Sequence, residues 1–166
     1  MSRKTRFDDL MEAVTFAEVG EIHTARTIAA RVFPDGDGAP GERILAVSRA
    51  AGFSRRMIEH AVGMAERLHF GLIALSAPPA LARLVARLRD RTGGKGPWLP
   101  AEEFRATAAE RGIAFAHAVG KGDPERAVAE VRRRFRRIAF LLVEPAHRPE
   151  ARLTSVDLPV FYLDER

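Results

Sequence analysis

Five short apolar runs are spaced along this chain, and longer stretches with helical periodicity lie between them. Each run has the length of a buried strand, and together they cover residues 44–48, 70–75, 113–119, 138–143 and 158–163. Strands that alternate with helices predict a parallel sheet covered by helices. We therefore expect an α/β fold with a doubly wound, five-stranded, mostly parallel sheet.

The helical stretches carry recognisable start signals. Ser54 is suited to cap a helix that runs to about Leu68, whose apolar residues fall on one face. Asp123 followed by Pro124 is a combination favoured at a helix start, and it predicts a helix over 123–137. Two more helices are expected, over 78–91 and 101–111.

The residues before the first strand form a separate unit in this interpretation. Helical periodicity over 6–33 is interrupted at Gly20, which predicts an N-terminal helical hairpin within residues 1–33. The Pro- and Gly-rich segment 34–42 is predicted to be a linker, and the α/β domain to occupy 43–166. Because one hairpin cannot bury its own apolar face, we expect it to pack on the main domain or on a partner protein.

Composition narrows the function classes. The chain has 166 residues, 46% hydrophobic and 30% charged, as expected of a globular protein. It contains no cysteine, which excludes disulfides, thiolate metal sites and cysteine nucleophiles. Its five histidines lack ligand spacing, which argues against a metal site. No apolar run approaches the ~20 residues that span a bilayer and no secretory signal is recognised, so we expect a cytoplasmic protein without membrane insertion.

The formal charge of +5 raises the question of a polyanionic partner. Every basic residue except Lys4, Lys95 and Lys121 is arginine, a skew that a GC-rich genome would produce, so the basicity is a weak functional signal. The predicted helix over 123–137 has no aromatic platform for bases, and most of the arginines in its last part lie outside its apolar stripe: Arg132, Arg133, Arg134, Arg136 and Arg137. We expect a solvated face, or one that meets an acidic partner, and nucleic-acid binding is disfavoured.

Three segments share features with a known family. The first is Ile44-Leu45 through Phe53-Ser54-Arg55-Arg56 and on to Ile58-Glu59-His60-Ala61, the second is Val119-Gly120 with Gly122-Asp123-Pro124, and the third is Leu158-Pro159-Val160-Phe161. In this order and spacing, over residues 43–163, they resemble the universal stress protein superfamily. The resemblance implies the α/β fold already expected, a role in the stress response, and a homodimer formed through the last strand.

The same resemblance bears on ATP. Family members that bind ATP have an acidic residue after strand one and a Gly-x-x-Gly loop after strand four, where backbone N–H groups approach the phosphates. Here Arg49 replaces the acidic residue, and Glu144-Pro145-Ala146-His147 contains no glycine. Since Glu144 would also repel a phosphate, we expect a degenerate nucleotide-binding site and no cofactor.

Candidate ligand contacts remain at two predicted strand ends. They are Ser48, Arg49, Gly120, Lys121 and Gly122. The charge of Lys121 and the N–H groups of the following helix would suit a small anion at the carboxyl edge of the sheet. The two glycines are also needed for a tight turn and Asp123 already caps the helix, so a structural turn is the preferred interpretation and a ligand contact the alternative.

Two function classes follow, with a third less favoured. The first is a non-catalytic regulatory or adaptor protein that does not bind ATP and docks partners through its N-terminal hairpin. The alternative is a stress sensor that binds ATP, another adenine nucleotide or a small anion through Arg49 and Lys121. An enzyme is least favoured because no nucleophile or acid–base set converges; Ser48 and Ser76 end strands but lie outside a Gly-x-Ser-x-Gly turn.

Overall fold

The computed structural model describes residues 41–79, 98–144, 153 and 156–163, together with Glu12, Val14 and Thr15. The predicted helical hairpin, the linker up to residue 40 and the predicted helix after Pro79 lie outside these residues, except for the three positions near the N-terminus.

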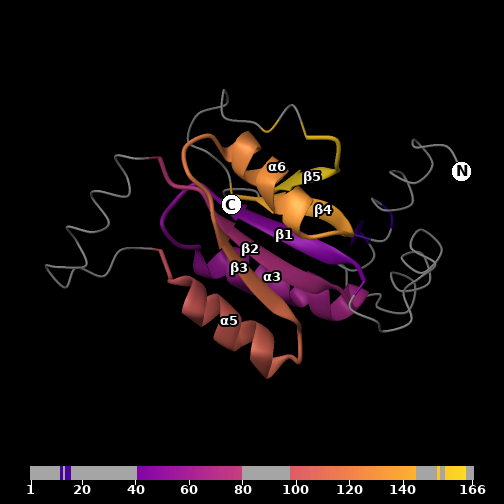
Figure 1. The fold of residues 1–166 in the computed structure, drawn as a ribbon. Coiled ribbons are helices and arrows are strands. Elements are labelled where there is room, and N and C mark those ends of the chain that lie inside the picture. The colour runs from indigo at the N-terminus through magenta and orange to yellow at the C-terminus, as the bar shows by residue number, and fades with distance from the viewer. Residues whose placement is uncertain are drawn as a thin grey trace, which may run out of the picture.

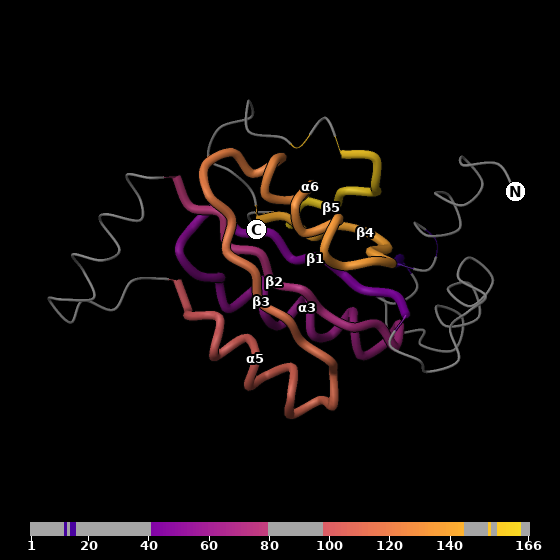
Figure 2. The backbone as a smooth tube through the Cα atoms, viewed as in Figure 1, coloured from indigo at the N-terminus to yellow at the C-terminus, as the bar shows by residue number. Residues whose placement is uncertain are grey.

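The described core is a five-stranded sheet in which every strand pair is parallel. The order is β3-β2-β1-β4-β5, so β1 is central and β3 and β5 are the two edges (Figure 2). The strands are β1 (Arg43–Ser48), β2 (Gly71–Ser76), β3 (Phe115–Val119), β4 (Ile138–Val143) and β5 (Val160–Tyr162). The predicted doubly wound α/β sheet is confirmed.

Helices cover both faces of this sheet (Figure 1). One face packs against α3 (Arg55–Leu68) and α5 (Ala101–Glu110), and the other against α6 (Pro124–Arg134). Alternate residues of a strand point to opposite faces, so Ala46 joins the core under α3 while Val47 joins the core under α6. The strands therefore read as continuous apolar runs because both faces are buried.

Local side-chain chemistry starts two of the helices where the sequence predicts. The Ser54 hydroxyl accepts the backbone N–H of Met57 at 3.0 Å and caps α3. The Asp123 carboxylate accepts the N–H groups of Glu125 and Arg126, and Pro124 follows as the first residue of α6. Each cap satisfies N–H groups that the first helical turn leaves without a partner.

Three elements are shorter than predicted, and one of them is β3, which begins at Phe115 instead of residue 113. The helix expected over 123–137 ends at Arg134, because Phe135 has an extended backbone and packs its ring against the core under α6. Arg137 then turns the chain at a φ of 60° before β4 begins. The last strand covers only Val160–Tyr162 instead of 158–163, since Pro159 has no N–H to give to a ladder.

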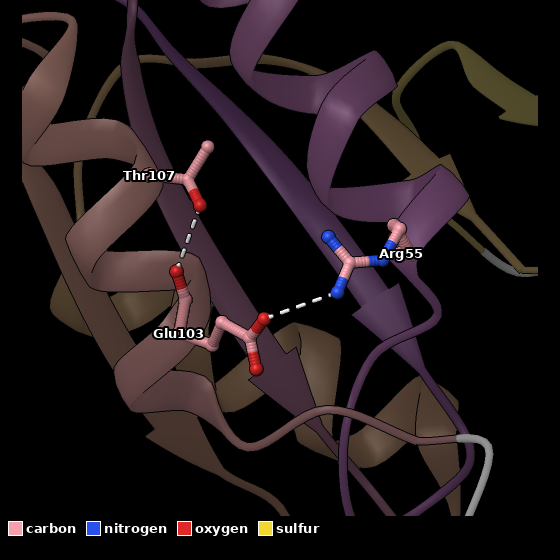
Figure 3. Close-up of polar contacts among 3 residues, drawn as sticks. All are labelled: Arg55, Glu103 and Thr107. Carbon is pink, nitrogen blue, oxygen red and sulfur yellow. Dashed lines mark hydrogen bonds and ion pairs between the residues drawn. The ribbon is translucent and has the colours of Figure 1, made fainter.

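The α3 and α5 helices are joined by polar and aromatic contacts. Arg55 on α3 and Glu103 on α5 point toward one another, with Nη2 and Oε1 3.4 Å apart (Figure 3). Beneath them the rings of Phe53 and Phe104 pack edge to face with centroids 5.2 Å apart. Phe53 also forms an antiparallel bridge with Leu99, which ties the start of α5 to the loop before α3.

Val14 links the N-terminal segment to the α/β domain. Its side chain is 5% exposed and belongs to the core under α3. It lines one cavity with Leu142, Phe161 and Leu163, which belong to β4 and to β5 and its end. Val14 therefore contacts the α/β domain, while the packing of the predicted hairpin as a whole lies outside the described residues.

Candidate functional site

The strand order creates a switch point at the carboxyl ends of β1 and β4. The chain leaves β1 toward β2 through α3, whereas it enters β4, on the other side of β1, through α6. Open α/β sheets bind ligands in the crevice where the strand order reverses in this way. The residues at this point are Ser48, which ends β1, and Glu144, which follows β4.

Polar residues lie at the carboxyl ends of β1, β2 and β4 and in the middle of β3, on the sheet face that packs against α3 and α5. Ser48 and Ser76 are directly paired across β1 and β2. The alternation of side chains places both on the face of Ala46 and Ala74, which belong to the core under α3. The same alternation places His117 of β3 and Glu144 after β4 on this face. We refer to Ser48, Ser76, His117 and Glu144 as the polar row.

Glu144 is the acidic residue of the polar row, and it is buried, with 6% of its surface exposed. Its Oε1 accepts the backbone N–H of Ser54 at 2.7 Å. Ser54 is the N-cap of α3, so the carboxylate lies at a helix N-terminus, where the helix dipole favours negative charge. Oε2 is buried and has no hydrogen-bond partner among the residues described. A protein carboxylate thus already fills the position where an anionic ligand group would meet this helix.

Ser76 and His117 form a second contact in the polar row, with Oγ and Nε2 3.1 Å apart. Burial lowers the pKa of His117 from its ordinary 6.5, while Glu102 raises it and Arg105 lowers it by smaller amounts. The imidazole is therefore neutral near pH 7. A hydroxyl beside a neutral imidazole is the pairing of a nucleophile with its base. Ser76 is only 3% exposed, however, which shields its hydroxyl from a substrate and makes the contact a structural link between β2 and β3.

The predicted ligand residues after β1 and β3 are not brought onto adjacent strands. Ser48 is fully buried, and its Oγ accepts the N–H of Ala50 at 3.1 Å. Arg49 is partly buried after β1 and Lys121 is exposed after β3. Because β2 lies between these strands, their ends are separated by two strand spacings, about 10 Å. A role of these residues in ligand binding stays a prediction.

Packing accounts for the glycines of the predicted turn. A Cβ on Gly120 would lie 2.4 Å from the Cβ of Ala127 in α6 and 3.1 Å from that of Ala77. Gly122 has a φ of 78°, which favours glycine, and open space around its Cβ position. Gly120 is therefore required for the close approach of α6 to the end of β2, and Gly122 for the turn into the Asp123 cap.

Comparisons with known proteins show which solved structures this fold resembles. No family model and no curated protein matches the chain. Among solved structures, a protein of the universal stress protein family from Burkholderia pseudomallei is similar over 77% of this chain and 98% of its own, with 17% identity and a TM-score of 0.51. A universal stress protein in complex with cAMP is similar over 75% of this chain and 98% of its own, with 17% identity and a TM-score of 0.47.

The chain has the universal stress protein fold. This likeness confirms the architecture that the resemblance implies, for the part of residues 43–163 that the structure describes. In the described part of this universal stress protein-like chain, no three histidine or acidic residues are grouped as metal ligands, and no helix is long and apolar enough to cross a membrane.

Two contacts of the polar row in this universal stress protein-like fold were not predicted from sequence. One joins Glu144 to Ser54 and the other joins Ser76 to His117. Each pair is distant in sequence, so no local motif marks it. The sequence does contain one signal for these contacts. A single polar residue ends or directly follows each of three apolar strands, and the alternation of side chains places all three residues on the same face of the sheet: Ser48, Ser76 and Glu144.

Proposed function

We propose that this chain is a regulatory or adaptor protein of universal stress protein type that acts by contacts, without catalysis and without ATP. The observation that carries the proposal is the buried carboxylate of Glu144 at the N-terminus of α3. A phosphate at the switch point would meet this negative charge where family members present glycine N–H groups. Arg49 follows β1, where family members that bind ATP have an acidic residue, so the charge at that position is reversed.

Two features of the site support a non-catalytic role. The Ser76 hydroxyl is enclosed, and its imidazole partner holds it across two strands. The hydrogen bond from Ser54 to Glu144 joins α3 to the end of β4, and the contact between Ser76 and His117 joins β2 to β3. Contacts of this kind are expected of groups that stabilise the domain. The purified protein should hydrolyse Mg-ATP no faster than buffer alone. ATP hydrolysis that elutes together with the single protein peak in size-exclusion chromatography would refute the non-catalytic role.

We further propose that the chain forms a homodimer through β5. This strand is the edge of the described sheet, and an edge strand can pair with a second chain. Pro159 O accepts the N–H of Leu141 and Leu163 N donates to Val143 O. Since alternate residues of a parallel strand bond to the same neighbour, the backbone groups of Val160 point away from β4, toward the outer edge.

Light scattering on the full-length protein tests the dimer. The wild-type protein should have twice the mass of one chain. Val160→Pro removes an outward N–H without removing a bond to β4, so it should yield a folded monomer. Val119→Pro at the other edge strand is the matched control and should remain dimeric. A wild-type monomer, or a dimer that Val160→Pro leaves intact, would contradict pairing through β5.

A further inference from the structure

Arginines gather at the amino ends of β1 and β4, the sheet edge opposite to the switch point. Because α6 leads into β4, its last turn lies at this edge. Arg43, which begins β1, lies here too, since its guanidinium donates to the carbonyl of Arg136 at 3.1 Å across 93 positions of sequence. With Arg43, the arginine patch consists of five exposed residues at and after the end of α6: Arg132, Arg133, Arg134, Arg136 and Arg137.

Part of the arginine patch has structural contacts. Arg43 binds the chain after α6 twice, through its guanidinium and through its backbone N–H, which donates to the carbonyl of Arg137 at 2.9 Å. Arg134 lies over the ring of Phe135, with its Cζ 5.4 Å from the ring centroid. These contacts fix the backbone from which the other arginines of the patch project.

Arg132, Arg133 and Arg136 differ from these residues. In the described part of the chain, no acidic side chain forms an ion pair with any of the three. No acidic residue occurs between Val131 and Val143, so the charges of the run repel one another. The helix dipole offsets part of this repulsion in the last turn of α6, but Arg136 lies beyond the helix. A negatively charged partner would remove the repulsion.

The surroundings of the patch decide between classes of polyanion. Single-stranded nucleic acid is bound through exposed aromatic rings, but Phe135 is half-buried in the core under α6 and Arg134 lies over its ring. A basic surface that anchors to a membrane combines its charge with exposed apolar side chains. The exposed large apolar residues of the described chain lie outside the patch: Trp98, Val119 and Tyr162.

A protein carboxylate fits the remaining chemistry, because a guanidinium binds it through two parallel hydrogen bonds. We propose that the arginine patch docks an acidic segment of a partner protein, whose carboxylates pair with Arg132, Arg133 and Arg136. This inference rests on the adaptor role proposed above and gives that role a partner class. The docking surface lies on the edge of the sheet away from Glu144, so it does not involve the switch point.

NMR spectroscopy of the full-length wild-type protein tests this docking without any substitution. A short polyglutamate peptide is the probe, in ~0.15 M salt, where exposed charges more than ~8 Å apart are largely screened. The backbone amide signals of residues 132–137 should shift saturably, while those of Ser48 and Lys121 at the opposite edge should not. A polyglutamine peptide of the same length should produce no shift.

Two triple variants separate the patch from the overall charge. Removal of the three unpaired arginines should weaken polyglutamate binding about tenfold, because each exposed ion pair contributes little alone: Arg132→Gln, Arg133→Gln and Arg136→Gln. The matched control removes the same charge at α3 and α5, on the other side of the sheet (Figure 1), and should bind as the wild-type protein does: Arg55→Gln, Arg105→Gln and Arg111→Gln.

Four results would overturn the proposal. The first is the absence of a saturable shift at residues 132–137, and the second is an equal loss of binding in both triple variants. The third is tighter binding of an oligonucleotide of equal charge, or of anionic lipid vesicles, at the same amides. The fourth is a lower mass of the patch variant in light scattering, which would make the patch an interface between copies. Binding of ATP would refute the proposed function but would leave these peptide titrations unchanged, so the two failures are distinguishable.

Discussion

Glu144 Oε1 accepts the backbone N–H of Ser54 at 2.7 Å, although the two residues are 90 positions apart. The contact joins the end of β4 to the N-cap of α3, across the point where the strand order reverses. It places a buried carboxylate where the fold offers a helix N-terminus to an anion.

Substitution of Glu144 tests the structural weight of this contact. Glu144→Ala should lower the free energy of unfolding by about 1–3 kcal/mol, because it leaves the Ser54 N–H without its acceptor. Glu144→Gln keeps an amide oxygen at the same place and should cost less. Urea denaturation followed by circular dichroism measures both. An alanine variant as stable as the wild-type protein would show that the contact contributes nothing to folding.

Gly120 tests the structural interpretation of the glycine turn. Gly120→Ala should destabilise the protein by about 1–3 kcal/mol, because the new methyl group would overlap with Ala127 of α6. Lys121→Ala, at the next and exposed position, should change stability by no more than about 0.5 kcal/mol. Thermal denaturation of the two variants compares them. If Gly120→Ala were neutral, the close approach of α6 would not be what requires glycine.

His117 predicts a pH dependence of stability. Its pKa in the folded protein is lowered from 6.5, mainly by burial, so the unfolded chain binds a proton first as the pH falls. Above about pH 6.5 the titration of His117 should therefore not reduce the free energy of unfolding. As the pH falls from there toward the lowered pKa, the free energy of unfolding should decrease.

Two variants isolate this contribution. His117→Gln cannot titrate, so its stability should fall less steeply than that of the wild-type protein just below pH 6.5. Thr107→Ala, which changes a side chain that does not titrate, should retain the wild-type slope. Urea denaturation at a series of pH values gives the slopes, and identical slopes for the wild-type protein and His117→Gln would show that His117 is not the titrating group.

Local signals explain which parts of the fold were predictable. Ser54 and the Asp123-Pro124 pair act on N–H groups within three residues, so the helix starts can be inferred from the sequence alone. The apolar run of β4 is predicted to the residue, because both faces of the strand are buried. The end of α6 is not, since the extended backbone of Phe135 depends on packing against the sheet.

The candidate site was less predictable because its contacts are not local. The sequence predicts that Glu144 repels a phosphate, but it does not predict the hydrogen bond from Ser54 to Glu144. That bond depends on the placement of α3 over β4. The register of β2 and β3 likewise brings Ser76 to His117 across 41 positions. Gly120, for which a ligand contact is the alternative interpretation, is buried against Ala127, a contact that no sequence motif records.

A calorimetric titration with Mg-ATP tests the central claim most directly. The full-length protein, freed of nucleotide, is titrated at low and at high salt, because a basic surface attracts polyanions through charges that salt screens. The account predicts no saturable binding, with any heat at low salt disappearing at high salt. Saturable binding of one ATP per chain that survives high salt would contradict it, and would mean that the carboxylate of Glu144 does not keep the switch point from nucleotides.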